Sequence, residues 1–207
     1  MVCRVYFVRH GETEWNATRR VQGHSDVPLS EKGREQARLL SKRLSSEKID
    51  CFYSSDLDRA VETARILAAP HNLDVNVTAE LRELNFGDWE GMTYEEMRKN
   101  APWTIKDWFR NPVDNYIPAG EKLLDMARRC DAALQRITGS HEGETVVVVA
   151  HGATIRSIIC SVLELDYRRL WKIDLGNTSL SRIDFSEWEQ GEGVIKLIND
   201  CTHLQDN

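Results

Sequence analysis

The sequence predicts an α/β fold in which helices cover both faces of a mostly parallel β-sheet. Two short apolar runs, residues 5–8 and 146–150, show no polar alternation, which is typical of strands buried on both faces. Between these runs, predicted strands and helices alternate along the chain, as they do in α/β proteins. The chain has 207 residues, enough for one domain with a substantial core.

The first predicted helix follows the opening strand and covers "PLSEKGREQARLLSKRLSSEK". Ser30 has a hydroxyl side chain suited to the N-cap position. Ala37, Leu40 and Leu44 recur at spacings of three and four residues, which places them on one apolar face of a helix. We therefore expect this helix to pack on the sheet through that face.

A second strand is predicted at residues 50–54, and the helix that follows at 57–69 ends where Pro70 would interrupt it. Residues 85–121 depart from this alternation, because they combine several aromatic residues with three prolines and little strand pattern. We expect this segment to be a mostly helical insertion rather than a separate domain.

A long helix is predicted at residues 121–138, before the second core strand, and another helix at 152–165. The segments "TSLSRIDFSEW" and "GVIKLIND" then predict a closing antiparallel hairpin. Its exposed edge could pair with a second copy of the chain, so a homodimer is one expected partnership.

Composition narrows the function classes. The formal net charge of −6 gives no support to a nucleic-acid or membrane-surface role. The five cysteines are scattered singly without a CxxC pair, which argues against a disulfide framework or zinc ribbon and favours a reducing compartment. The first residues do not resemble a signal peptide, and the longest apolar run is far shorter than the ~20 residues of a membrane span. We expect a cytoplasmic protein.

Cationic and imidazole side chains stand where three predicted strands end. Arg9 and His10 follow the first strand, Arg59 follows the second, and His151 follows the run at 146–150. Ligands of open α/β sheets bind outside the carboxyl ends of the strands, so we expect these side chains to lie together. Two arginines and two histidines would repel one another unless they hold an anion, and guanidinium groups bind phosphate or carboxylate bidentately.

Glycines follow both histidines. Gly11 and Gly152 would let the backbone approach a ligand closely, and the helix starts that follow offer N–H groups to its oxygens. The neighbouring cations are expected to lower the pKa of His10 from its ordinary value of about 6.5. A neutral imidazole is a nucleophile. Each residue alone has an ordinary structural explanation, so the expectation rests on their combination.

Four segments in this order, "VRHGETEWN", "SSDLDRAVETA", "LRELNFGDWEG" and "VAHGATIR", resemble the histidine phosphatase superfamily, the phosphoglycerate-mutase-like proteins. The resemblance extends from residue 5 to about residue 177 and is strongest to small bacterial α-ribazole phosphate and broad-specificity phosphatases. It implies that residues 1–207 form a single histidine-phosphatase domain. The implied fold is a three-layer α/β/α sandwich with a mostly parallel central sheet and a helical insertion at about 85–121 over the site.

The resemblance also implies roles for matching residues. His10 would be the phosphorylated nucleophile and Glu83 the proton donor. Arg9, Arg59 and His151 would complete the phosphate pocket. The remaining residues expected on the substrate side are Asn16, Gln22, Gly23 and Gly152. No metal is expected, because the two arginines would repel a divalent cation, and no cofactor is expected.

We therefore expect a metal-independent phosphatase that hydrolyses small phosphorylated metabolites through a phosphohistidine, with α-ribazole 5′-phosphate as one candidate substrate. A cofactor-dependent phosphoglycerate mutase is the nearest alternative, although mutase relatives carry Glu-Arg-His-Tyr-Gly where this chain has "LRELNFGDWEG". A non-catalytic phospho-ligand sensor is the third hypothesis, and such a protein would be expected to lack His10 or Glu83.

Two features bear on the substrate. Tryptophans of the insertion, Trp89, Trp103 and Trp108, could stack on a benzimidazole or could simply pack the insertion onto the sheet. Lys122 stands in "PAGEK", where many relatives have Pro-Gly-Gly-Glu-Ser, and could bind a carboxylate or a second phosphate. The other cations considered for that role are Arg98 and Lys106. The sequence leaves both questions open.

Overall fold

The structure, a computed structural model, describes residues 1–100, 102–186 and 192–205, with side chains for all of these except 102 and 103. Six strands among these residues form one mixed sheet in the order β3-β2-β4-β1-β5-β6. They are β1 (Cys3–Arg9), β2 (Cys51–Ser55), β3 (Val75–Thr78), β4 (Thr145–Ala150), β5 (Leu180–Phe185) and β6 (Val194–Asp200). Strands β1 to β4 are mutually parallel, and β5 is antiparallel to both β1 and β6.

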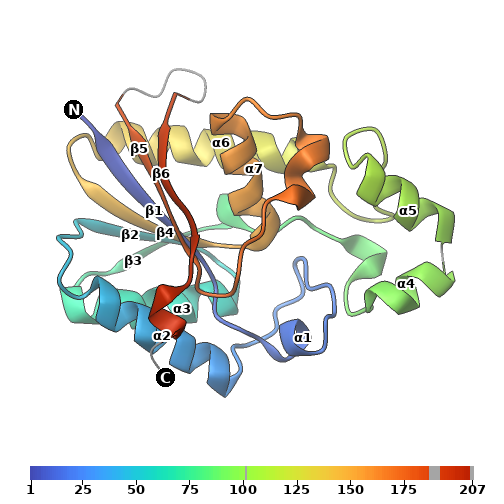
Figure 1. Ribbon diagram of the computed structural model, residues 1–207, viewed down its shortest axis with the longest axis horizontal. Helices are drawn as coiled ribbons and strands as arrows, with labels where there is room; N and C mark the ends of the chain where they lie inside the picture. Colours follow the sequence, from blue (N-terminus) through green and yellow to red (C-terminus); the bar gives the residue numbers. More distant parts are fainter. Residues whose placement is uncertain (101, 187–191, 206–207) are drawn as a thin grey trace.

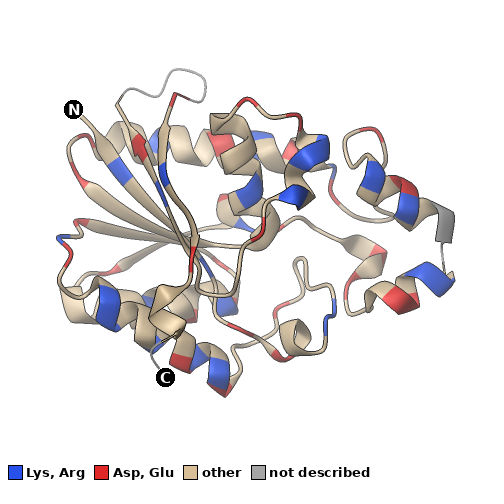
Figure 2. Cartoon of the chain, viewed as in Figure 1, with Lys and Arg blue, Asp and Glu red and all other residues tan. Residues whose placement is uncertain are grey.

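Helices cover both faces of this sheet (Figure 1). One face carries α2 (Glu31–Leu44) and α3 (Asp58–Ala68), and the other carries α6 (Leu123–Ser140) and α7 (Gly152–Val162). The predicted three-layer α/β/α sandwich is therefore confirmed. Figure 2 shows positive and negative residues interspersed over the helices. Within the described residues, no helix is long and apolar enough to cross a membrane.

Strand β1 shows why the opening apolar run lacks alternation. Tyr6 and Val8 belong to the core cluster under α2 and α3, whereas Val5 and Phe7 belong to the cluster under α6 and α7. All four side chains are buried, because each face of the strand lies against a helix layer. Burial on both faces removes the need for polar residues at alternate positions.

The predicted N-cap is confirmed at the start of α2. The hydroxyl of Ser30 accepts a hydrogen bond from the backbone N–H of Gly33 at 3.1 Å. The apolar face expected for this helix is buried through Ala37, Leu40 and Leu44. Local sequence pattern was sufficient to place this helix and its packing face.

Strand β3 was not predicted. It spans only Val75–Thr78, lies at the edge of the sheet and pairs with β2 alone. None of its residues is fully buried, so the segment lacks the apolar run that identified β1 and β4.

The predicted closing hairpin is confirmed by the antiparallel pair β5 and β6. The short α1 (Glu14–Ala17) and the 3-10 helix η4 (Tyr167–Lys172) were also missed.

The segment at 85–121 contains the helices α4 (Tyr94–Asn100) and α5 (Pro102–Arg110), which extend from one side of the molecule (Figure 1). Trp108 is 1% exposed, and its ring lies 5.5 Å from that of Trp89 and 5.7 Å from that of Trp171, between centroids. Trp89 and Trp108 therefore pack against each other within this segment, and Trp108 also packs against Trp171 of η4. The side chain of Trp103 lies outside the described residues.

Candidate active site

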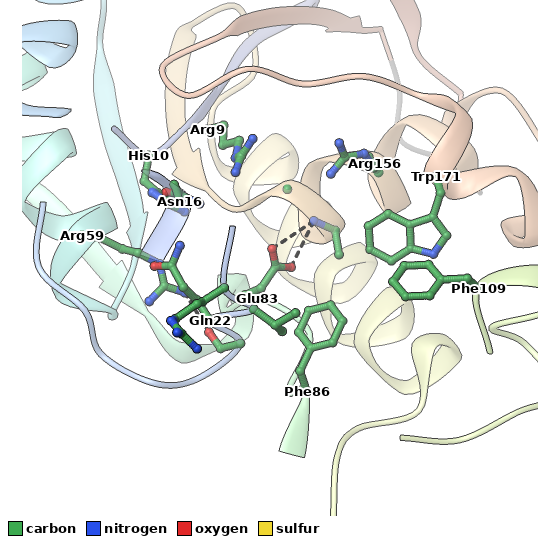
Figure 3. A pocket seen from close by; sticks show the side chains of 15 residues that line it. Arg9, His10, Asn16, Gln22, Arg59, Glu83, Phe86, Phe109, Arg156 and Trp171 are labelled. Carbon is green, nitrogen blue, oxygen red and sulfur yellow. Dashed lines mark hydrogen bonds between the residues drawn. The ribbon is translucent and has the colours of Figure 1, made fainter. Parts of the chain in front are cut away.

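The carboxyl ends of β1, β2 and β4 meet at one edge of the sheet, because these parallel strands are neighbours. A pocket of ≈ 210 Å³ opens at this edge (Figure 3). Its lining includes these residues singled out from the sequence: Arg9, His10, Asn16, Gln22, Gly23, Arg59, Glu83 and Gly152. His151 is absent from the lining but packs against His10.

His10 is held in one tautomer. The residue is 3% exposed, and Nδ1 lies 2.7 Å from the carbonyl oxygen of Gly11. A carbonyl oxygen can only accept, so Nδ1 carries the proton and Nε2 has the lone pair. Burial is the largest cause that holds the pKa of His10 well below its usual range, and the charges of Arg59 and Arg9 add to it. The arrangement therefore offers a neutral imidazole with a free nucleophilic nitrogen at the pocket.

His151 is fully buried, and its ring centroid lies 5.2 Å from that of His10. Neither of its ring nitrogens has a hydrogen-bond partner among the described residues. Burial is the largest cause that lowers the pKa of His151 well below its usual range, and Arg59 adds to it. A buried polar side chain without partners is costly, so these nitrogens are suited to contact a polar ligand or intermediate.

Arg9 and Arg59 are anchored by carbonyl oxygens. Nη1 of Arg9 donates to Leu175 at 2.6 Å, and the Arg59 guanidinium donates to Gly23 at 2.7 Å and to Ser25 at 2.8 Å. Neither arginine forms an ion pair with a carboxylate in the described part of the chain. Burial, with the charge of Arg156, lowers the pKa of Arg9 to about 10. Two oriented cations that no carboxylate contacts directly make this end of the pocket a site for an anion.

The two glycines have different roles. A Cβ on Gly11 would lie 2.5 Å from the carbonyl oxygen of Gly33, so Gly11 makes room for the backbone of α2 rather than for a ligand. The expectation that it admits a ligand was wrong. A Cβ on Gly152 would instead lie 2.7 Å from Nη1 of Arg156 and 3.6 Å from Oε2 of Glu83, on the pocket side.

Glu83 lies at the amino end of α7 (Figure 3). Both carboxylate oxygens are 3.1 Å from the backbone N–H of Ala153, and Oε1 also accepts from the N–H of Leu84 at 2.9 Å. These bonds turn the carboxylate toward the pocket. Among the described residues, no group of three His, Cys, Asp or Glu side chains is placed to hold a metal ion.

Glu90 contacts the loop that holds Arg59, and it was not predicted from the sequence. Its carboxylate accepts hydrogen bonds from the backbone N–H groups of His24 and Ser25, each at 2.8 Å, and from the Ser25 hydroxyl at 2.6 Å. The same loop supplies the carbonyl oxygens of Gly23 and Ser25 that hold Arg59. Glu90 therefore orients Arg59 through the loop. It stands in the segment "LNFGDWEG", but its spacing does not reveal this contact.

The cations that line the pocket differ from those considered for substrate recognition. Lys122 is exposed at the start of α6 and is absent from the lining, as are Arg98 and Lys106. Arg20 and Arg156 occupy the lining instead. Arg156 lies four residues after Gly152 on α7, and that helical spacing is the sequence signal that could have identified it.

Fold and site together define an α/β protein with a histidine-centred anion pocket, and comparison with known proteins gives its family. Residues 5–201 match the model of the histidine phosphatase superfamily (branch 1). The chain belongs to this superfamily.

Relatives of similar length are known. The chain is 42% identical to phosphoglycerate mutase-like protein 4 of Arabidopsis thaliana over 98% of this chain and 87% of that one. It is 35% identical to phosphoserine phosphatase 1 of Hydrogenobacter thermophilus over 97% of this chain and 94% of that one. Among solved structures, Bacillus stearothermophilus YhfR is similar with a TM-score of 0.90 and 34% identity, covering 98% of this chain and 99% of that chain.

Proposed function

We propose that this protein is a metal-independent phosphatase that hydrolyses small phosphomonoesters through a phosphohistidine at His10. The observation that carries the proposal is the neutral His10, with Nδ1 bonded to Gly11 and Nε2 free, beside two arginines that have no carboxylate partner. Membership of the superfamily and similarity to a protein named phosphoserine phosphatase support hydrolysis.

In the first half-reaction, Arg9 and Arg59 bind the phosphoryl oxygens. The unpartnered ring nitrogens of His151, which packs against His10 behind the lining, complete the contact as phosphorus reaches His10. Nε2 of His10 attacks phosphorus in line, so a P–N bond forms as the P–O bond to the leaving group breaks. Protonated Glu83 gives its proton to the departing alkoxide. Phosphoryl transfer depends mainly on positioning and charge stabilisation, which these groups supply. The same arginines would repel a divalent cation, which supports a metal-independent reaction.

In the second half-reaction, a water molecule attacks the phosphohistidine. Glu83, now ionised, accepts a proton from that water, and the new P–O bond forms as the P–N bond breaks. Phosphate leaves, His10 returns to its neutral form and Glu83 is protonated again. A single carboxyl group thus acts as acid and then as base, consistent with its place on the pocket wall.

The pocket volume of ≈ 210 Å³ is below the roughly 300–1,000 Å³ typical of sites for drug-sized ligands. This favours a compact ester. α-Ribazole 5′-phosphate is the second candidate substrate, and the observation in its favour is an apolar wall of Phe86, Phe109 and Trp171 that could contact a benzimidazole.

Purified protein in EDTA would be given para-nitrophenyl phosphate, O-phosphoserine, 3-phosphoglycerate and α-ribazole 5′-phosphate. We expect phosphate release that falls by at least about 10³-fold in His10→Ala, since the nucleophile is lost. His71→Asn, a histidine outside the pocket, is the matched control. Absence of release from every ester by the wild-type protein would exclude the phosphatase.

The mutase alternative is tested in the same series. If 3-phosphoglycerate is converted to 2-phosphoglycerate in the presence of a bisphosphate primer, faster than phosphate is released, the protein is a mutase. Binding of phosphate esters without either reaction would identify a sensor.

A further inference from the structure

Arg156 is a third guanidinium in the pocket without a carboxylate partner. Like Arg9 and Arg59, it lines the pocket and forms no ion pair with any described carboxylate. Arg20 also lines the pocket, but it pairs with Glu96 at 2.9 Å. A phosphate dianion would balance the charges of Arg9 and Arg59. The carboxylates whose charges act on Arg156 are Glu83, which is neutral when it serves as the acid, and Asp174, and neither forms an ion pair with it.

Arg156 lies on the side of Glu83 away from the nucleophile. In Figure 3, His10 and Arg59 stand at one end of the pocket, Glu83 in the middle, and Arg156 with Trp171 at the other end. In the proposed reaction Glu83 protonates the oxygen that leaves. A leaving group that extends past Glu83 from the phosphoryl site would reach Arg156.

The guanidinium of Arg156 is held in place with one edge free. Nε donates to the carbonyl oxygen of Ile173 at 2.6 Å, and Cζ lies 5.5 Å from the centre of the Trp171 ring. Within the described residues, its two terminal NH₂ groups have no hydrogen-bond acceptor. Two such groups side by side match the two oxygens of a carboxylate.

We propose that Arg156 binds a carboxylate on the leaving group and so selects compact phosphoesters of hydroxy acids, such as O-phosphoserine or 3-phosphoglycerate. This inference rests on the proposed phosphatase function and adds a specificity residue to it. One guanidinium matches the single charge of a carboxylate, whereas a second phosphate dianion would leave excess negative charge. The ≈ 210 Å³ volume also suits a leaving group of a few carbon atoms.

The test compares O-phospho-L-serine with O-phosphoethanolamine, which differs from it only by the absence of the carboxylate. We expect wild-type kcat/KM to be higher for phosphoserine. In Arg156→Gln, kcat/KM for phosphoserine should fall about 10- to 100-fold, mainly through KM, because a charged hydrogen-bonded contact is lost. The value for phosphoethanolamine should change by less than about threefold. Arg156→Lys, which keeps the charge, should retain part of the preference.

Arg38→Gln on the exposed surface of α2 is the matched control for loss of a guanidinium, and we expect it to leave both substrates unaffected. Equal losses of kcat/KM for the two substrates in Arg156→Gln would overturn the inference. Equal kcat/KM values of the wild-type enzyme for phosphoserine and phosphoethanolamine would also overturn it. His10-dependent hydrolysis of para-nitrophenyl phosphate reports on the phosphatase itself. If that hydrolysis is observed together with either of those results, the role of Arg156 is rejected and the phosphatase function stands.

Discussion

The imidazole rings of His10 and His151 lie with their centroids 5.2 Å apart, and both rings are buried beside arginine side chains. Burial and the charges of Arg9 and Arg59 lower the pKa of each histidine well below its usual value. The native pocket therefore holds both rings neutral, and protonation of either would add charge to an already cationic site.

The free energy of unfolding should fall as the pH drops below about 6.5. Histidines in the unfolded chain are protonated below that pH, whereas His10 and His151 in the folded chain are still neutral. The unfolded state then binds more protons, and stability decreases by up to about 1.4 kcal/mol per pH unit for each histidine. Urea unfolding between about pH 7.5 and about pH 5.5 measures this slope. His151→Asn should make the slope shallower, and an unchanged slope would contradict the assignment.

Replacing Glu90 with Gln should weaken binding of phosphate. The neutral amide is a poorer acceptor for the N–H groups of His24 and Ser25, so the loop that holds Arg59 loses its anchor. We expect the inhibition constant of inorganic phosphate to rise about tenfold, since hydrogen bonds to charged groups are worth ~1.5–3 kcal/mol. Glu95→Gln, an exposed position on α4, is the control. Unaltered phosphate inhibition in Glu90→Gln would show that Glu90 does not act on Arg59.

Trp108→Ala should destabilise the protein by about 3–5 kcal/mol, because it removes a fully buried aromatic side chain. Phe109 and Trp171, which contact Trp108 and line the pocket, would lose their support, so hydrolysis should also fall. Urea unfolding gives the loss of stability. Tyr116→Ala removes a side chain from a residue that is 70% exposed and should stay within about 0.5 kcal/mol of wild type. Similar losses for both variants would refute the packing role of Trp108.

Gly11→Ala should cost about 1–3 kcal/mol of stability, the usual range for overpacking. Its new methyl group would lie 2.5 Å from the carbonyl oxygen of Gly33, and a helix backbone cannot move as easily as a side chain. Gly139→Ala is the control, because nothing lies within 4 Å of its Cβ position in α6. We expect that variant to equal or exceed wild-type stability. Thermal unfolding compares the two, and a neutral Gly11→Ala would disprove the close contact.

Elements with a strong local signal were predictable. The apolar runs of β1 and β4 showed burial on both faces, and Ser30 marked the start of α2. β3 was not predictable in the same way, since its four residues become a strand only by pairing with β2 at the sheet edge. Strand pairing between distant segments produces no clear apolar or alternating pattern in a short, half-exposed sequence.

The sequence by itself determined the α/β class, the superfamily and the side chains that stand at the carboxyl ends of the strands. His10, Arg59 and His151 could be grouped because parallel neighbouring strands end at the same edge of a sheet. Only the tertiary structure decided that the backbone of α2 packs directly against Gly11 and that Glu90 anchors the loop around Arg59. Those contacts join residues far apart in the chain, and their geometry depends on how helices and loops pack on the sheet rather than on local spacing.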